Sequence, residues 1–250
     1  MKISLIIPAY NEDRRIGGTL SDYYNAFTGE EGFDVFEIIV EMDGCTDKTA
    51  EIVSEFSNYK DNVKILEYDE RLGKGGGIRR AFRAATGDII GFTDADNSTK
   101  AKELIKLIRT LDLADVDVVV GQRYGGFNNI PLVRRVFSRG FNLLVRLLFR
   151  LNIRDTQCGA KVFKKEVVKE ELSHLIIDDF TFDVNFLYSA KKLEFKIKEV
   201  EIEWEHNEGS RVKLFSTTIK MFISLLKLRL FYSPFRFLLK VNRREEVEVL

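Results

Sequence analysis

The chain has 250 residues but no run of about 18 consecutive apolar residues, which argues against a segment that crosses a membrane. Only two cysteines are present, and the separation of Cys45 and Cys158 fits neither a metal-binding nor a redox motif. The 39 basic and 39 acidic residues cancel, so net charge indicates no class of partner. The apolar stretch at the N-terminus is too short for a signal peptide and predicts a first strand. We therefore expect a cytoplasmic chain without a transmembrane span.

The first half alternates apolar strand patterns with helix patterns. Strands are expected at residues 2–10, 35–43, 63–69, 88–94 and 115–123, and helices at residues 14–27, 46–59, 76–85 and 99–111. Near-continuous apolar strands that alternate with helices predict an α/β fold, in which a mostly parallel sheet is covered by helices on both faces. Ligands of such sheets bind beyond the carboxyl ends of the strands.

The second half carries two basic segments. Residues 134–154 contain six arginines and no acid, and residues 212–244 contain eight lysines or arginines and no acid. Both repeat polar residues at helical spacing, which predicts amphipathic helices with apolar opposite faces. In the second segment this polar stripe is Lys213, Thr217, Lys220, Ser224 and Lys227. Either helix alone fits packing on the sheet, with its basic face in solvent, as well as it fits membrane contact. Two such helices in a neutral chain favour an anionic membrane surface.

Two acids, Asp94 and Asp96, stand at the carboxyl end of the fourth expected strand. Side chains two residues apart on a strand point to one face, so both carboxylates can approach one cation. Like charges this close repel unless a cation or a proton compensates them, and Mg²⁺ or Mn²⁺ is the natural partner. A turn with a helix cap is an equally ordinary use of this motif, so both interpretations stay open.

Lys74 and three glycines precede the third expected helix. Backbone N–H groups at a helix start suit a phosphate, yet a flexible turn before a helix explains these glycines equally well. Asp43 ends the second expected strand, where a helix cap on the following residues does not explain it.

Several motifs together identify a family. "IIPAYNE", "MDGCTDKT", "GKGGGIRRAF", "GDIIGFTDADNSTK" and "GQRY" follow the order and spacing of glycosyltransferase family 2. The stretches "RDTQCGAKVF", "FTFDVNFLYSAKK" and "EVEIEWEHNEGSR" resemble its polyprenyl-phosphate sugar synthases, above all the dolichyl-phosphate β-glucosyltransferase group. The resemblance spans roughly residues 2–232. It implies a GT-A type fold in a single catalytic domain, residues 1–232, followed by a charged tail, residues 233–250. Residues 1–125 would bind the nucleotide-sugar, and residues 126–232 would face the acceptor and the membrane.

The resemblance also implies roles for individual residues. Direct roles in the reaction fall to Asp96, Arg123 and Asp155. Nucleotide contacts fall to Pro8, Tyr10, Glu12, Asp43, Lys74 and Asp94. Asp94 and Asp96 would hold the divalent cation, Mg²⁺ or Mn²⁺. The acceptor phosphate would meet Arg123, Arg134, Ser138 and Arg211, and the sugar would meet Gln157 and Asp183.

The implied reaction is inverting transfer of a sugar, most simply glucose from UDP-glucose, to a polyprenyl or dolichyl phosphate. It would occur on the cytoplasmic face of a membrane, with the chain bound peripherally. Alternatives are mannose from GDP-mannose, a glycan or another lipid as acceptor, or a non-catalytic membrane-associated binding protein. Nucleic-acid binding is not expected, since the basic segments lack an aromatic stacking platform.

Two features depart from the family pattern. Met42 and Cys45 replace an acid and a serine around Asp43. Eukaryotic members of the group also carry an N-terminal anchor that is not found in this sequence, so attachment is expected through the two basic segments.

Overall fold

The computed structural model describes residues 1–124, 132–205, 207 and 214–239. Within these ranges the side chains of residues 132–139, 214–216 and 238 are not described. Every structural statement below refers to the described part of the chain.

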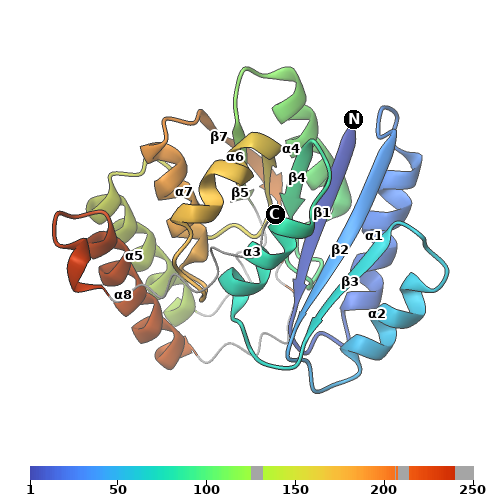
Figure 1. Cartoon of the computed structure of the whole chain (residues 1–250), viewed down its shortest axis with the longest axis horizontal. Helices are drawn as coiled ribbons and strands as arrows, with labels where there is room; N and C mark the ends of the chain where they lie inside the picture. The colour runs from blue at the N-terminus through green and yellow to red at the C-terminus, as the bar shows by residue number, and fades with distance from the viewer. Residues whose placement is uncertain (125–131, 206, 208–213, 240–250) are drawn as a thin grey trace.

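One sheet of seven described strands forms the centre of the molecule (Figure 1). The strands are β1 (Lys2–Ala9), β2 (Val35–Asp43), β3 (Val63–Tyr68), β4 (Ile89–Phe92), β5 (Val118–Tyr124), β6 (Lys161–Lys164) and β7 (Ile197–Glu203). Their order is β3-β2-β1-β4-β6-β5-β7. β6 runs antiparallel to its neighbours β4 and β5, and the other pairs are parallel. The expected mostly parallel sheet is confirmed, and both halves of the chain contribute strands to it.

Helices cover both faces of the sheet. One face carries α1 (Ile16–Gly29), α2 (Thr49–Ser57) and α4 (Ala101–Leu113). The other carries α3 (Lys74–Ala84), α5 (Leu132–Phe149), α6 (Lys165–Glu171), α7 (Phe182–Lys192) and α8 (Leu214–Phe231). Two short 3₁₀ helices, η2 (Leu172–His174) and η3 (Arg236–Leu238), follow α6 and α8. Because strand side chains alternate between faces, Ile38 and Val40 of β2 enter the first core and Ile39 enters the second.

The expected strands of the first half agree with the observed ones to within a few residues. Beyond them, β7 was not anticipated from the sequence pattern, and neither was β6. β6 has only four residues and carries a lysine at each end, so it lacks the apolar run that marks the strands of the first half. Its reversed direction brings its first residue, Lys161, to the same edge as the carboxyl ends of β4 and β5.

Helices α5 and α8 lie side by side at one end of the molecule (Figure 1). Ser224 of α8 donates a hydrogen bond to Asp179 at 2.6 Å, and Lys227 donates to the carbonyl of Ile176 at 3.4 Å. The expected polar stripe of α8 therefore turns partly toward the protein. The apolar side chains exposed on α8 are Ile219, Phe222, Ile223 and Leu226. In the structure, α8 therefore turns part of its polar stripe toward the protein and exposes part of its apolar face.

No helix in the described ranges has the length and apolar character needed to span a bilayer.

Candidate functional site

The two acids after β4 lie at the strand-end edge of the sheet. Asp94 and Asp96 follow β4 directly, and their side chains are 45% and 29% exposed. Gly159 lies against Asp94, since a Cβ built on this glycine would come within 1.9 Å of an Asp94 carboxylate oxygen. Asp96 accepts a hydrogen bond from the backbone N–H of Ser98 at 3.0 Å. Both carboxylates thus project from a tightly packed loop at the strand-end edge of the sheet, which we call the strand-end crevice.

A lysine from α3 contacts the first of these acids. The Lys74 ammonium lies 3.0 Å from Asp94 and 3.4 Å from Asp183 of α7. Asp183 also receives the fully buried Lys161 ammonium at 2.5 Å. Burial raises the pKa of Asp94, but Lys74, with Lys161 and Arg123, outweighs burial and lowers it. Lys74, Asp183 and Asp94 therefore meet in one place, although they are distant in sequence.

The second acid belongs to a different charge cluster. Arg15 lies 4.0 Å from Asp96 and binds both carboxylate oxygens of Glu12 at 2.7 Å. Burial raises the pKa of Asp96, and the neighbouring charge of Asp94 adds to that effect. Burial likewise raises the pKa of Glu12, against the pull of Arg15. A cation bound between Asp94 and Asp96 would offset the repulsion between their carboxylates.

The predicted nucleotide contacts at β1 and β2 form a third cluster. Asp43 is buried and accepts hydrogen bonds from Arg71 at 2.9 Å, from the backbone N–H of Gly73 at 3.1 Å and from that of Leu72. The Arg71 guanidinium lies 3.3 Å from the ring centroid of Tyr10, which is 37% exposed. Pro8 lies partly buried at the end of β1. Tyr10 with Arg71 offers an exposed flat surface at this end of the crevice, and the uridine contact stays a prediction.

The glycines that follow Lys74 serve packing rather than phosphate binding. The N–H groups of Gly75 and Gly76 donate to the Asp178 carbonyl at 2.7 and 3.4 Å. A Cβ on Gly75 would meet the carbonyl of Ile177 at 2.3 Å, and one on Gly77 would meet Glu41 at 2.2 Å. The N–H groups of Gly75 and Gly76 are therefore already bonded to protein, and the three glycines lie buried inside α3 rather than in a flexible turn before it.

A bidentate ion pair lies near Asp94, whose pKa the charge of Arg123 helps to lower. Arg123 at the end of β5 donates to both carboxylate oxygens of Asp155, at 2.6 and 2.7 Å. Its guanidinium lies 5.4 Å from the ring centroid of Trp204. Beside them, the Nε2 of Gln157 is buried and has no hydrogen-bond partner among the described residues. An orphaned amide donor at this position suits a hydroxyl group of a ligand.

The chain that follows β7 contacts the acidic loop. The backbone N–H of Glu205 donates to the Ser98 carbonyl at 3.0 Å, and the side-chain amide of Asn207 donates to the Asp96 carbonyl at 2.7 Å. Glu205 and Asn207 therefore support the loop that carries the candidate metal ligands.

Three predicted acceptor-phosphate contacts cannot be placed. Arg211 lies outside the described residues, and Arg134 and Ser138 belong to α5, where their side chains are outside the described set. Of this predicted group, only Arg123 has a described position, in the crevice.

Sequence reasoning missed four contributors: Arg15, Arg71, Lys161 and Trp204. Lys161 and Trp204 lie inside the quoted motifs, so the motifs held a signal for them, whereas nothing in the sequence pattern singles out Arg15 or Arg71.

The residues fit a divalent cation that also binds a phosphate. No cluster of three or more His, Cys, Asp or Glu able to hold a metal occurs in the described part of the chain. Asp94 and Asp96 nevertheless supply two hard oxygen ligands, and Mg²⁺ or Mn²⁺ commonly completes such a pair with ligand phosphates and water.

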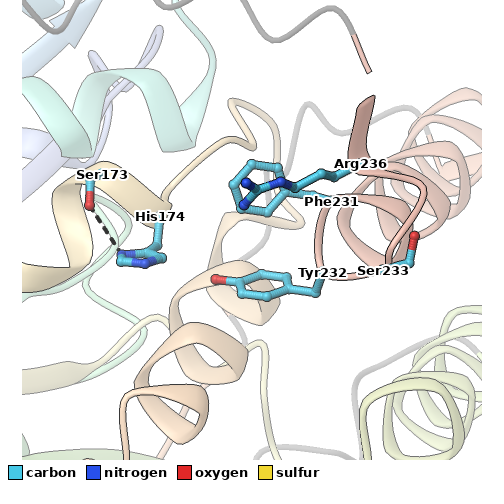
Figure 2. A pocket seen from close by; sticks show the side chains of 6 residues that line it. All are labelled: Ser173, His174, Phe231, Tyr232, Ser233 and Arg236. Carbon is cyan, nitrogen blue, oxygen red and sulfur yellow. Dashed lines mark hydrogen bonds between the residues drawn. The ribbon is translucent and has the colours of Figure 1, made fainter. Parts of the chain in front are cut away.

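Two concavities lie away from the strand-end crevice. The first, of about 530 Å³, lies between η2 and the end of α8; Ser173, His174 and Tyr232 are among the side chains drawn around it in Figure 2. The second, of about 720 Å³, lies where α5 and α7 end, beside Arg150 and Lys191. Neither is lined by a residue of the strand-end site, so we place no substrate in either.

Sequence comparisons identify relatives across most of the chain. A family model described as glycosyl transferase family 2 matches residues 4–172. The dolichyl-phosphate beta-glucosyltransferase of Dictyostelium discoideum is 31% identical, with 96% of this chain aligned to 76% of that one. The human protein of the same name is 30% identical, with coverages of 92% and 76%. Glycosyltransferase AglD of Haloferax volcanii is 32% identical over 91% of this chain, which spans only 37% of AglD.

Solved structures share the fold. Glucosyl-3-phosphoglycerate synthase of Mycobacterium tuberculosis in complex with UDP matches with a TM-score of 0.70 at 19% identity, covering 91% of this chain and 80% of that one. The same enzyme with Mn²⁺, UDP and glucosyl-3-phosphoglycerate matches with a TM-score of 0.68 at 20% identity, with coverages of 91% and 79%. The GT-A type fold expected from the sequence is confirmed.

Proposed function

This chain belongs to glycosyl transferase family 2 and is a glycosyltransferase, and from that premise we propose that it transfers glucose from UDP-glucose to a polyprenyl or dolichyl phosphate with inversion at the anomeric carbon. One observation carries the proposal: Asp94 and Asp96, two candidate metal ligands, share the strand-end crevice with the cations Lys74 and Arg123. The names of the relatives support glucose and a dolichyl phosphate, and the UDP complexes of the structural relatives support a uridine donor.

The donor diphosphate would lie beside Asp94 and Asp96. A divalent cation there would offset the negative charge that develops on the leaving diphosphate. Lys74 adds a second positive charge at the same place. The uridine would lie toward Tyr10 and Asp43, at the ends of β1 and β2.

The acceptor needs no general base. A phosphate monoester is largely ionised near neutral pH, so its oxygen can attack the anomeric carbon without losing a proton. The bond to the diphosphate oxygen breaks as the new bond forms on the opposite face of the sugar. Arg123 would bind the incoming phosphate, because a guanidinium binds phosphate bidentately and keeps its charge. Arg134, Ser138 and Arg211 remain predicted partners.

The sugar would contact Gln157, whose buried amide has a donor to offer, with Asp155 beside it. Asp183 is less suited to a sugar contact, because its side chain is only 2% exposed and two lysines hold it. The same pairing argues against Asp183 as a base, in agreement with an acceptor that requires none.

The exposed apolar face of α8, together with exposed Leu143 and Leu147 of α5, would contact a bilayer. Neither helix contains an acid, and Lys220, Arg146 and Arg150 are exposed beside the apolar side chains. Apolar side chains rimmed by cations are complementary to an anionic membrane surface. A membrane would also hold the lipid-linked acceptor. The cytoplasmic face remains a prediction.

Transfer is tested with purified protein, Mn²⁺, a short-chain polyprenyl phosphate and radiolabelled UDP-glucose, GDP-mannose or UDP-N-acetylglucosamine in parallel. We expect label on the lipid from UDP-glucose alone, and its loss when EDTA is added. Label from GDP-mannose alone would overturn the choice of sugar, and nucleotide binding without lipid labelling would overturn the acceptor.

Asp96→Ala should abolish transfer and leave the fold intact by circular dichroism, because it removes a ligand of the cation. Arg123→Ala should raise the KM for polyprenyl phosphate more than the KM for UDP-glucose. Normal turnover of Asp96→Ala would contradict the metal role.

Membrane contact is tested by flotation with phosphatidylserine-containing vesicles. Phe222→Asp should reduce binding by about 10-fold or more, since it removes an apolar side chain that would enter the bilayer and adds a charge that anionic lipids repel. Leu113→Asp is the matched control, because Leu113 is 83% exposed on the opposite face of the sheet. Self-association of the wild type without vesicle binding would show that the face binds a second copy instead.

A further inference from the structure

Lys161, the first residue of β6, is a lysine without solvent exposure. Its ammonium donates to Asp183 at 2.5 Å and to the carbonyl of Cys158. It also lies 5.2 Å from the ring centroid of Phe92, whose other near cation is Lys74 at 5.6 Å. A carboxylate, a carbonyl and an aromatic ring therefore surround the Lys161 ammonium.

From Lys161, charges of alternating sign lead out to the crevice. Lys161 pairs with Asp183, Asp183 pairs with Lys74, and Lys74 pairs with Asp94. We call these four residues the charge ladder. Its members come from β6, α7, α3 and the loop after β4, so the ladder ties together the elements that surround the crevice.

Exposure rises step by step along the ladder. The side chains of Lys161, Asp183, Lys74 and Asp94 are 0%, 2%, 12% and 45% exposed. Solvent and ligands can therefore reach the outer end, while the inner end is enclosed. The Lys74–Asp94 contact can therefore exchange partners with a ligand, whereas the Lys161–Asp183 contact is enclosed by protein.

Fold stability alone gives little reason for a fully buried lysine. Taking an ammonium and a carboxylate out of water costs several kcal/mol per ion, and apolar residues of similar volume often stabilise a fold equally well. What the inner pair does provide is a fixed negative charge beside Lys74. If Asp94 were the only partner of Lys74, a cation that attracted Asp94 would leave Lys74 without a counter-charge.

We propose that Lys161 and Asp183 are positioning residues, which hold the Lys74 ammonium at the crevice so that it can pass from Asp94 to the donor diphosphate when Asp94 binds the cation. Asp183 keeps its contact with the Lys74 ammonium during that movement, and Lys161 holds Asp183 in place. This inference rests on the proposed nucleotide-sugar donor and assigns roles to two residues that touch no substrate.

The test measures UDP affinity by calorimetry in the presence of Mn²⁺, without any sugar transfer. Lys74→Met should weaken UDP binding by about 10- to 100-fold, the value of one charge-assisted hydrogen bond. Lys161→Met should weaken it in the same direction, and the double variant should bind no more weakly than Lys74→Met alone, because both changes act through one ammonium. Lys164→Met on the same strand breaks the partly exposed pair with Asp117 and should leave UDP affinity unchanged.

A second variant separates positioning from folding. Lys161→Met combined with Asp183→Leu replaces the inner pair by apolar side chains and should recover the unfolding temperature lost in Lys161→Met. It should still bind UDP weakly. Recovery of both stability and UDP affinity in this double variant would overturn the proposal. So would a Lys74→Met/Lys161→Met variant whose loss of UDP affinity is the product of the two single losses.

The outcome also separates this inference from the proposed function. A wild type that binds UDP but glucosylates no lipid phosphate would contradict the proposed acceptor. The role of the charge ladder in UDP binding could still be tested. A wild type that binds neither UDP nor GDP would overturn both.

Discussion

Two enclosed acids, Asp183 and Glu41, have opposite surroundings. Asp183 lies in the first turn of α7 between the ammonium groups of Lys161 and Lys74. Glu41 lies in β2, and neither of its carboxylate oxygens has a hydrogen-bond partner among the described residues. Burial, with the nearby charge of Asp43, raises the pKa of Glu41 to about 8. Lysines compensate one buried acid, and a proton neutralises the other.

The two acids also differ in what their carboxylates face. A charge that belongs to the donor site must be present at every working pH, and an ion pair provides that without a proton. Glu41 points instead at the glycine face of α3, where it fills space against Gly77. Glu171 resembles Glu41: burial raises its pKa to about 9, and among the described residues only Ser189 donates to it.

Replacing each acid by its amide should separate the two most clearly. Asp183→Asn leaves two buried ammonium groups with reduced compensation, so we expect the free energy of unfolding to fall by about 3–5 kcal/mol. Glu41→Gln removes no counter-charge and should cost far less. Urea denaturation at pH 7 measures both, and equal losses would remove the distinction.

Gly77→Ala tests whether Glu41 is as closely packed as the structure indicates. The added methyl group would lie 2.2 Å from a Glu41 oxygen, so we expect a loss of about 1–3 kcal/mol despite the better helix propensity of alanine. Combining it with Glu41→Ala should remove most of that loss. Gly18→Ala is the control: nothing lies within 4 Å of the new atom, and it should be neutral or stabilising.

The pH dependence of unfolding sharpens the comparison further. The pKa values of Glu41 and Glu171 are raised in the folded state, to about 8 and about 9, from an ordinary value of 4.5. The folded state therefore holds more protons, and stability is lost as pH rises from 4.5 toward 8. Each group contributes at most about 1.4 kcal/mol per pH unit. Glu41→Gln should remove about half of that slope, and an unchanged slope would contradict the assignment.

The smallest effect is expected at an exposed pair. Lys102 and Glu203 lie 2.6 Å apart, as close as the inner pair of the ladder, but are 66% and 72% exposed. Lys102→Met should change the free energy of unfolding by less than about 0.5 kcal/mol, since solvent screens the pair. A loss like that of Asp183→Asn would mean that burial is not the deciding factor.

The sequence predicted five of the seven described strands because these are short, mostly apolar segments, and it predicted a polar strand-end edge because acidic and polar residues follow them. Asp94 and Asp96, two apart on a strand end, could be found in this way. β6 could not, since four residues with lysines at both ends carry no strand periodicity.

Contacts between distant residues had no signal in spacing. Lys74 and Asp183 are 109 positions apart, and only folding brings them together. The orientation of α8 escaped prediction for the same reason. From the helix pattern alone its polar stripe is expected to face solvent, but in the fold Ser224 of that stripe donates a hydrogen bond to Asp179.

Trp204, which lies beside Arg123, allows ligand binding at this site to be followed by fluorescence. Trp204 is the single tryptophan of the chain, so tryptophan emission reports on this indole alone, and its ring centroid lies 5.4 Å from the guanidinium. An anion that draws Arg123 out of its pair with Asp155 changes the electric field at the indole and shifts the emission. A titration with phosphate-bearing lipid can therefore follow occupancy of the acceptor side on the unlabelled protein.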